Sequence, residues 1–445
     1  MTMELPEYVR DCLNTLETAG FRGWAVGGCV RDACLGRVPH DFDLCTDALP
    51  EQIRDIFSDR ELVLAGMKHG TVSVVTRNGL VEITTLRAEG GYRDGRHPDW
   101  VKFVPELRED LLRRDFTMNA MAWSPREGLQ DPFLGREDLQ KGILRAVGDP
   151  YLRFREDALR ILRGVRFAVR FHLTVEEETF RAMVELAPLM DGLSRERVFA
   201  ELCALLPGIT GPDLLRYAPI ITQVIPELKP TVGFDQHCPH HAYDLYTHIA
   251  FVTGAVSADL TLRWAALLHD VGKISTFTLD ENGRGHFLGH ARAGAEMADG
   301  ILRRLKAPTA LREQVTVLIQ NHMTRLEENK RFLKRRVRAL GWDSVEALLI
   351  LQEADMGSKG TGKGEELQQF SRIRALLEEI RAENACLRLQ DLAVNGNDMM
   401  ALGLQGKEIG KTLNALLDAV LDERIPNDRE ALLRYAREMA LSLTN

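Results

Sequence analysis

Two aspartates one residue apart, Asp41 and Asp43, lie in the segment HDFDL and have the chemistry of metal ligands. Side chains at positions i and i+2 of a β-strand point to the same face, so in an extended segment both carboxylates reach the same one or two Mg²⁺ ions. We expect a third acid, Glu82 of LVEITTLR, on a neighbouring strand. Acids grouped in this way serve phosphoryl or nucleotidyl transfer, in which metals activate the attacking oxygen and stabilise the leaving one.

A glycine pair, Gly27 and Gly28, precedes these acids and follows the predicted strand GWAV. Glycine lets the backbone approach a ligand closely, and the helix predicted for VRDACLG presents amide groups at its beginning. This geometry suits an anion that Arg31 neutralises. Each motif alone also occurs as a turn or a solvated strand edge, so the prediction of a phosphate loop beside a metal site depends on their combination.

The helix predicted for DALRILRGVR carries a charged stripe and an apolar stripe at the same spacing, so that one face packs while its neighbour is charged. The charged stripe comprises Asp157, Arg160, Arg163 and Arg166. Cytosine and adenine each offer an amino donor next to a ring-nitrogen acceptor. A carboxylate and a guanidinium pair with both and leave uracil and guanine unpaired, so Asp157 and Arg160 are candidates for reading the base. An exposed helix with salt bridges is the alternative.

A second group of potential ligands lies in the C-terminal half. It comprises His248, the adjacent His269 and Asp270 after an apolar helical segment, and Asp355 on a later one. Neutral imidazoles combined with carboxylates suit a divalent transition metal. His290 and His322 either bind a second metal or are polar or core histidines, and His237, His240 and His241 belong to a segment leading into this module.

Two kinds of scaffold are needed to position these residues. Strand-like runs at 21–28, 61–87 and 100–106 alternate with helical patterns, and strand signals fade after about residue 125. We therefore predict an α+β fold, with a mixed-sheet head followed by an elongated all-α neck, body and tail. The predicted parts are a head (1–125), a neck of base-recognition helices (126–205), body helices that link it onward (206–236), a metal-binding helical module (237–360) and tail helices (361–445).

Composition and charge narrow the class of protein. The chain has 445 residues and a formal net charge of −8, which argues weakly against a nucleic-acid coat protein. No apolar run is long enough to span a bilayer, and the N-terminal segment reads as an acidic amphipathic helix, so we expect a cytoplasmic protein without a membrane partner. The segment 303–338, which contains KRFLKRRVR, is strongly basic and is either a solvated helix face or a polynucleotide-binding face.

Several segments together resemble one enzyme family. They are GGCVRDACLGRVPHDFDL, GMKHGTV, RRDFTMNAMAW, DPFLGREDL and REDALRILRGVRF. In combination, from about residue 20 to about residue 205, they resemble the class II CCA-adding tRNA nucleotidyltransferases of the polymerase-β-like superfamily. The resemblance implies a polymerase-β-like head and template-independent addition of C, C and A to tRNA 3′ ends from CTP and ATP.

The same resemblance implies roles for individual residues. Asp41 and Asp43 would hold the catalytic Mg²⁺, and the EDxxR motif at Glu156, Asp157 and Arg160 would select the base. The other implied nucleotide contacts are Arg114, Asp115 and Asn119, toward the triphosphate and ribose, and Arg163 and Arg166, toward the phosphates.

The histidine-rich module resembles the HD superfamily of metal-dependent phosphohydrolases. The ligand order H, HD, D is matched by His248, His269, Asp270 and Asp355. This resemblance implies either hydrolysis of phosphoesters, such as 2′,3′-cyclic ends of damaged tRNA, or a helical scaffold for the tRNA elbow with a structural metal or none. The segment after residue 385 resembles the family's tRNA-contacting tail. Within it the turn GLQGKEIG either holds a phosphate or joins a plain helical hairpin.

A polar, glycine-rich segment at 87–103 is a predicted mobile loop. It resembles the loop that family members need to add the terminal A, which favours full CCA addition. Addition of A alone and poly(A) polymerase activity remain alternatives. From other classes, an HD phosphohydrolase with a degenerate head and a non-catalytic tRNA-binding protein remain open, and the sequence indicates no oligomeric state.

Overall fold

The computed structural model describes residues 3–39, 41–90, 100–238, 242–360 and 364–443. The chain divides into two compact units, Met1–Ile209 with Arg216–Pro226, and Thr210–Leu215 with Glu227–Asn445. The mixed sheet belongs to the first unit and the histidine-rich helices to the second, as the α+β prediction requires. Among the described helices, none is long and apolar enough to cross a membrane.

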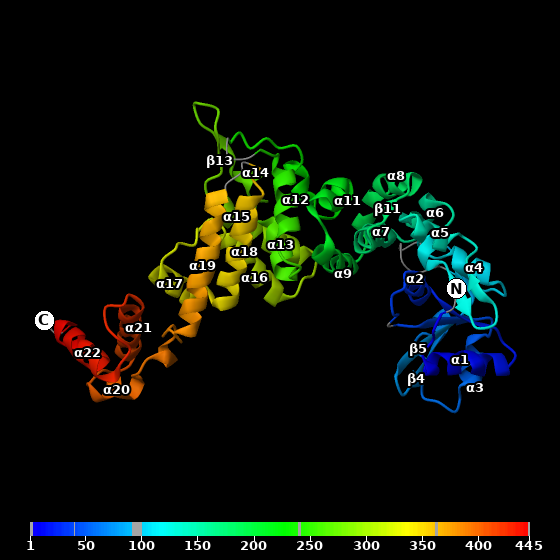
Figure 1. Ribbon diagram of the computed structural model, residues 1–445, viewed down its shortest axis with the longest axis horizontal. Coiled ribbons are helices and arrows are strands. Elements are labelled where there is room, and N and C mark those ends of the chain that lie inside the picture. Colours follow the sequence, from blue (N-terminus) through cyan, green and yellow to red (C-terminus); the bar gives the residue numbers. More distant parts are fainter. Residues whose placement is uncertain (1–2, 40, 91–99, 239–241, 361–363, 444–445) are drawn as a thin grey trace. The chain divides into compact units, whose positions relative to one another are not determined.

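A seven-stranded mixed sheet forms the head of the first unit (Figure 1). Its order is β3–β4–β5–β2–β1–β8–β9. The strands are β1 (Gly23–Val26), β2 (Asp43–Thr46), β3 (Leu62–Val63), β4 (Thr71–Thr76), β5 (Gly79–Thr85), β8 (Ala122–Ser124) and β9 (Gly128–Gln130). Among these described strands, β2 and β5 pair in parallel and the other neighbours are antiparallel. β8 and β9 were not predicted, because three residues are too few to display an alternating pattern.

Both faces of this sheet are packed, and β1 shows why. Successive side chains of a strand point to opposite faces. A Cβ on Gly23 would lie 2.9 Å from Leu13 of α1 (Glu7–Thr18), which places α1 on one face. Trp24 belongs to a buried apolar cluster with Leu111 of α4 (Leu107–Leu112) and therefore faces the other way. A third helix, α3 (Pro50–Ile56), packs against β4 and β5.

The predicted loop at 87–103 begins and ends as regular structure. Strands β6 (Arg87–Gly90) and β7 (Trp100–Phe103) form a two-stranded antiparallel sheet. The prediction for the middle of the segment, 91–99, lies outside the described residues.

The neck helices pack against the head through an aromatic cluster. The described helices of the neck are α5 (Gly135–Gln140), α6 (Pro150–Glu156), α7 (Leu159–Phe171), α8 (Glu177–Glu185) and α9 (Arg195–Leu205), with a short parallel pair β10 (Ile143–Leu144) and β11 (Thr174–Val175). The helix α2 (Gly28–Cys34) belongs to the head, and α11 (Ala218–Val224) follows the neck. Phe116 is fully buried, with its ring centroid 6.4 Å from that of Phe154 and 6.0 Å from that of Phe167. Gly164 lets α7 approach closely, because a Cβ there would lie 2.9 Å from Phe116 Cζ.

The second unit is helical apart from the hairpin β12 (Thr278–Leu279) and β13 (Gly285–His286). Its helices are α12 (Leu245–Ala255), α13 (Leu260–Leu268), α14 (Lys273–Thr276), α15 (His290–Arg304), α16 (Thr309–Asn321), α17 (Lys330–Leu340), α18 (Trp342–Gly357), α19 (Gly364–Ala382), α20 (Gly396–Ala401), α21 (Lys407–Leu421) and α22 (Arg429–Leu443), and α10 (Gly211–Arg216) lies at the division between the units. The helix α12 packs against α13, and α15 packs against α16. The two pairs are joined by contacts between α13 and α16, and α18 packs against both pairs.

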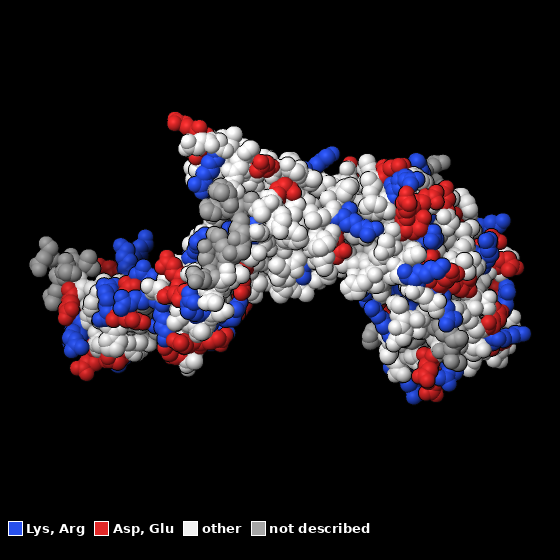
Figure 2. All heavy atoms as spheres, turned by 45° about the horizontal axis from the view of Figure 1, so that its top comes forward, with Lys and Arg blue, Asp and Glu red and all other residues white. Residues whose placement is uncertain are grey.

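The basic helix α17 is paired with acids of the same unit. Its ion pairs join Lys330 to Glu379 and Glu383, Arg331 and Lys334 to Glu423, Arg335 to Asp422 and Arg338 to Asp418. In Figure 2, positive and negative side chains are interleaved over the C-terminal helices instead of forming one basic field. Of the two readings left open by the sequence, these contacts favour a solvated, ion-paired helix face over a polynucleotide-binding face along this side of α17.

Replacing Phe116 with Ala tests the packing between head and neck. We expect the free energy of unfolding of the first unit to fall by about 3–5 kcal/mol, because removal of a large buried ring leaves a cavity that its neighbours fill only partly. A chain of two compact units need not unfold in a single transition. The measurement is therefore hydrogen exchange of the head and neck amides in urea, which reports the stability of each part. Val38→Ala, whose side chain is 79% exposed, is the control and should stay within about 0.5 kcal/mol. Equal protection in both variants would contradict this packing.

Candidate active site

The two predicted metal-binding strands are neighbours in the sheet. Asp43 begins β2 and lies directly opposite Glu82 in the parallel pairing of β2 with β5. Asp41 lies two residues before Asp43, outside β2, and each of the three acids keeps part of its surface open to solvent. Burial of its carboxyl and the nearby charges of Glu82 and Asp41 raise the pKa of Asp43, against the opposing effect of Arg114. Carboxylates grouped on the two central strands β2 and β5 match the oxygen donor set of a divalent cation.

The glycine pair lies where the backbone makes a sharp turn into α2. Gly27 has φ +72°, and a Cβ there would lie 2.9 Å from Nη1 of Arg114, so only glycine fits this position comfortably. Arg31 of α2 is buried and donates to Oδ1 of Asn119 over 2.8 Å. The loop therefore packs against a second predicted motif, RRDFTMNA.

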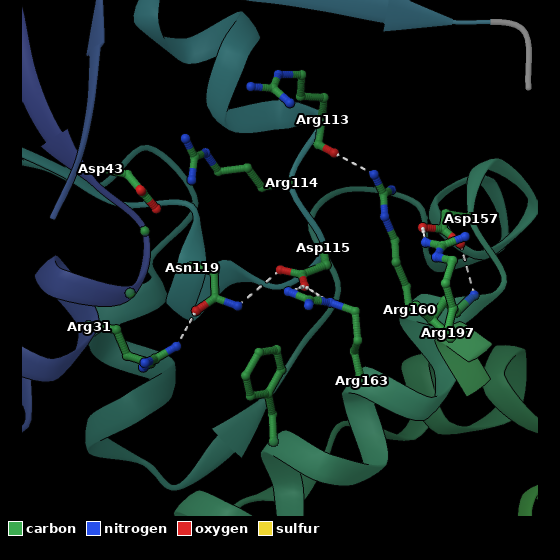
Figure 3. A pocket seen from close by; sticks show the side chains of 14 residues that line it. Arg31, Asp43, Arg113, Arg114, Asp115, Asn119, Asp157, Arg160, Arg163 and Arg197 are labelled. Carbon is green, nitrogen blue, oxygen red and sulfur yellow. Dashed lines mark hydrogen bonds and ion pairs between the residues drawn. The ribbon is translucent and has the colours of Figure 1, made fainter. Parts of the chain in front are cut away.

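A continuous hydrogen-bond chain joins this loop to the neck (Figure 3). Asn119 donates to Asp115 over 3.0 Å, and Asp115 receives two N–H groups of Arg163 over 2.9 and 2.8 Å. Burial works to raise the pKa of Asp115, but the charge of Arg163 and the Asn119 hydrogen bond outweigh it and hold the pKa below its usual value. Asp115 thus acts in this structure as a buried anchor that orients a guanidinium and an amide.

A second buried aspartate orients the guanidinium groups of the RRDF segment. Asp110 of α4 accepts from Nε and Nη2 of Arg113 over 3.0 and 2.8 Å and from Arg114 over 3.4 Å. Burial alone would raise the pKa of Asp110, but these two arginines lower it overall. Sequence reasoning missed Asp110, because an acid inside LREDLL resembles any solvated helix residue.

A hollow of about 440 Å³ lies between the glycine loop, the RRDF segment and the neck. It is lined by Gly27, Gly28, Arg31, Asp43, Arg113, Arg114, Asp115, Asn119, Asp157, Leu159, Arg160, Arg163, Phe167 and Arg197. In Figure 3, Asp43 lies on one side of this hollow and Asp157, Arg160 and Arg197 lie on the other. The hollow therefore offers one acidic edge and several guanidinium groups to a ligand, which suits an anion bound with a metal.

Most of the predicted nucleotide contacts line this hollow, and three predicted site residues do not. Glu82 lies opposite Asp43 on β5, Asp41 lies two residues before Asp43, and Arg166 pairs with Glu201 over 2.6 Å. The guanidinium of Arg166 lies over the ring of Phe167, 4.4 Å from its centroid. In this structure Arg166 braces α7 against α9.

The predicted base-reading pair is held from both sides. Asp157 accepts from Arg197 over 2.7 Å and from the backbone N–H of Leu159 over 3.0 Å. Arg160 donates to Glu156 over 2.8 Å and to the carbonyl of Arg113 over 2.9 Å. Arg197 comes from α9, forty residues after Asp157, and no local pattern in SRERVF could have assigned it to this hollow.

The histidine-rich module brings its predicted ligands together inside the second unit. Nε2 of His248 lies 3.0 Å from Asp355 and 3.5 Å from Asp270, and Nε2 of His269 lies 3.2 Å from Asp270. The other Asp270 oxygen lies 3.5 Å from His290 and 3.7 Å from His322. Two overlapping groups, His248–His269–Asp270 and Asp270–His290–His322, thus have the spacing of metal ligands.

Three imidazoles of this histidine cluster share one hydrogen-bonding pattern. Nδ1 of His269, His290 and His322 lies 2.6–2.7 Å from the carbonyl three residues earlier in each case, while Nε2 points toward Asp270. A backbone carbonyl at one ring nitrogen leaves the other as the metal-binding atom. Burial opposes the charge on Asp270, yet His269 and Lys273 outweigh it and hold the pKa of Asp270 well below its usual range.

Three family models match the chain. They are the poly A polymerase head domain over residues 23–145, the probable RNA- and SrmB-binding site of polymerase A over residues 172–231, and the putative tRNA nucleotidyltransferase domain 2 over residues 286–436. The first covers the sheet and the RRDF segment, and the third covers most of the second unit.

Known proteins resemble the chain over its full length. A CCA-adding enzyme of Levilactobacillus brevis is 34% identical over 432 residues, which is 96% of each protein. The crystal structure of the Bacillus stearothermophilus CCA-adding enzyme in complex with CTP has a TM-score of 0.68 at 28% identity and covers 98% of both chains. The Thermotoga maritima CCA-adding enzyme complexed with tRNA has the same fold, with a TM-score of 0.61 at 20% identity over 98% of this chain and 96% of the other.

Removing Asp43 should weaken metal binding beside β2 and β5. We expect Asp43→Asn to weaken Mn²⁺ binding at least about tenfold, since loss of even an outer-shell partner costs about 10- to 100-fold. The matched control is Asp47→Asn, because Asp47 lies just beyond the far end of β2 and pairs with Arg22. Both variants are made in a His269→Ala background so that the histidine cluster adds no signal, and binding is measured by electron paramagnetic resonance. Equal affinity in both would contradict the assignment.

Proposed function

The chain belongs to the CCA-adding enzyme family, and from this premise we propose that it adds C, C and A to tRNA 3′ ends from CTP and ATP, releasing pyrophosphate. The observation that carries the proposal is the hollow of about 440 Å³, where Asp43 faces a group of arginines and the Asp157–Arg160 pair. A triphosphate, a metal and a base edge each have a complementary group there. The full-length similarity to CCA-adding enzymes supports the same reaction.

The reaction is attack of the tRNA 3′-hydroxyl on the α-phosphorus of the nucleotide. In this proposal Asp41, Asp43 and Glu82 would hold Mg²⁺, which would supply charge neutralisation at the reacting oxygens, and the pairing of Asp43 with Glu82 supports it. Arg114, oriented by Asp110, and Arg163, oriented by Asp115, are positioned to bind the triphosphate. We expect the pyrophosphate to leave toward Gly28, Arg31 and the neck arginines, because guanidinium groups neutralise its charge.

Base selection follows from the hydrogen-bond donors of Arg160 and the acceptors of Asp157 that their contacts within the protein leave available to a base. Arginine has five N–H donors, of which Arg160 directs three to the carbonyls of Arg153 and Arg113 and to Glu156 within the described chain. The carboxylate of Asp157 keeps acceptor capacity beyond Arg197 and Leu159. The amino group of C or A pairs with Asp157 and its ring nitrogen with Arg160, whereas U and G would oppose like groups.

The segment 87–103 supports addition of A as well as C. Glu89 of β6 bonds to Arg113 over 3.1 Å, and the Arg113 carbonyl accepts from Arg160 over 2.9 Å, so the base of this hairpin contacts the nucleotide hollow. Restriction to A alone and poly(A) polymerase activity are the alternatives, and the full-length relatives carry the name of the CCA-adding activity.

One assay tests the proposal directly. The protein is incubated with tRNA transcripts that end before the first C, after the second C, or after the complete CCA, each with a single labelled nucleotide. We expect CTP to extend the first by two residues, ATP to extend the second by one, and no extension of the third. Long A tracts on any transcript would identify a poly(A) polymerase, and absence of CTP incorporation would contradict CCA addition.

Variants at Asp157 and Arg197 test base selection. We expect Asp157→Ala to raise incorporation of UTP relative to CTP by about tenfold or more, since an unpaired polar group costs about 1–3 kcal/mol. Arg197→Ala should raise it less, because the carboxylate remains but its orientation relaxes. Arg195→Ala, on the same helix and bonded to the Asp191 carbonyl, is the matched control and should keep wild-type selectivity. Unchanged selectivity in the Asp157 variant would place base reading elsewhere.

We further infer that the histidine cluster binds a divalent transition metal and hydrolyses phosphoesters. The favouring observation is the convergence of His248, His269, His290 and His322 on Asp270 in a buried site. Lys273 and Lys359, within 2.8 and 3.4 Å of Asp270 and Asp355, supply positive charge for a phosphate. A bound metal would polarise a phosphoryl oxygen, and the chain's own side chains hold and orient it.

Metal analysis decides whether this cluster is loaded. We expect purified wild-type protein to contain transition metal and His269→Ala to lose most of it, while His286→Ala retains it, because His286 is exposed and pairs with Asp280. Hydrolysis of a 2′,3′-cyclic nucleotide should fall in parallel with metal content. Equal metal content in the His269 and His286 variants would contradict the metal site. A protein that contains metal but does not hydrolyse the cyclic nucleotide would contradict the hydrolase activity and assign the metal a structural role.

A further inference from the structure

A second large hollow, of about 520 Å³, lies in the second unit where α17 and α19 end and α18 begins. It is lined by Val337, Arg338, Gly341, Trp342, Ile380, Arg381, Asn384, Ala385, Leu387, Arg388 and Asp391. Val337, Ile380 and Leu387 are buried and give the hollow an apolar base. None of these residues belongs to the nucleotide hollow of the head or to the histidine cluster.

An aromatic ring and a guanidinium form one wall. Gly341, with φ +83°, separates α17 from α18 and makes Trp342 the first residue of the next helix. The Arg381 guanidinium lies over the Trp342 ring, 4.6 Å from its centroid, and pairs with Glu346 over 2.5 Å. This wall is a fixed planar surface, because an ion pair holds the guanidinium against the ring.

Two further arginines flank the hollow and differ in how they are held. Arg338 is bound to Asn414 over 2.9 Å and paired with Asp418. Arg388 has a side chain that is 72% exposed, and its nearest acid, Asp391, is 3.4 Å away. That carboxylate also accepts the backbone N–H groups of Leu387 and Arg388. The shortest ion pair of Arg388 is longer than that of either other lining arginine, and its terminal nitrogens also lie 3.1 and 3.2 Å from the Gln390 amide. Its exposed guanidinium can still reach an outside anion.

We propose that this hollow binds one unpaired nucleotide of the tRNA. A flat surface of indole and guanidinium, an apolar base and a reachable cation match a splayed-out base with its phosphate, since proteins recognise unpaired RNA bases by stacking on aromatic rings and arginine planes. The proposal rests on the proposed function, which makes tRNA the partner. It places the RNA contact at the end of α17 instead of along its basic side, where Arg331, Lys334 and Arg335 are paired with acids.

The test compares tRNA binding by the full chain and three variants of the hollow, Trp342→Ala, Arg381→Ala and Arg388→Ala. The matched control is Arg374→Ala, because Arg374 also joins α19 to α18, through Glu353 over 2.8 Å, but does not line the hollow. Dissociation constants are measured by fluorescence anisotropy of a labelled tRNA transcript at several salt concentrations, and circular dichroism confirms folding. Trp342→Phe keeps an aromatic ring and serves as the rescue variant.

We expect Trp342→Ala and Arg381→Ala to weaken tRNA binding about tenfold, as loss of base stacking does, and Trp342→Phe to restore most of it. Arg388→Ala should weaken binding and reduce the slope of log K against log salt by about one, the loss of one phosphate contact. Wild-type affinity and salt slope in all three folded variants would overturn the inference. If the wild-type chain binds tRNA but adds no nucleotide, the proposed function is wrong. The nucleotide site of this hollow is then still decided by the dissociation constants of the variants.

Discussion

Repulsion among like charges is the constraint on which the candidate active site depends. Asp43 and Glu82 meet because β2 and β5 pair in parallel, and burial, together with the charges of Glu82 and Asp41, raises the pKa of Asp43. Arg114 and Arg163 are kept in place by two buried acids, Asp110 and Asp115. The fold thus holds separated charges ready for a ligand that carries both a cation and phosphates.

Much of this site could be predicted from sequence, because its motifs are local. Four motifs each predict their local conformation from residue spacing alone: the glycine pair, the DxD segment, the RRDF segment and the charged stripe. Most of their residues line one hollow. Long-range pairings have no such signal: Arg197 reaches Asp157 from forty residues away, and Arg166 turns to Glu201 although it continues the stripe. Short strands such as β8 and β9 and the register of Asp43 with Glu82 likewise depend on tertiary context.

In the second unit, too, the sequence predicts the local motif but not the contacts between residues far apart in the chain. The adjacent His269 and Asp270 indicated a metal site, and the helices also bring His290 and His322 to Asp270, the arrangement that the sequence left open. The basic segment in α17 was ambiguous because charge counts do not show partners. Its cations are paired with acids that lie in α19 and α21 or just after them, far along the chain.

The central claim is that the carboxylates at the edge of β2 and β5 hold the metal that acts on the α-phosphate. Incorporation from CTP with sulfur in place of each non-bridging α-phosphate oxygen tests it most directly. Mg²⁺ prefers oxygen ligands, so one sulfur isomer should react slowly with Mg²⁺ and recover with a softer ion such as Cd²⁺. Asp43→Asn should show no such recovery. Equal rates for both isomers with Mg²⁺ would contradict the account.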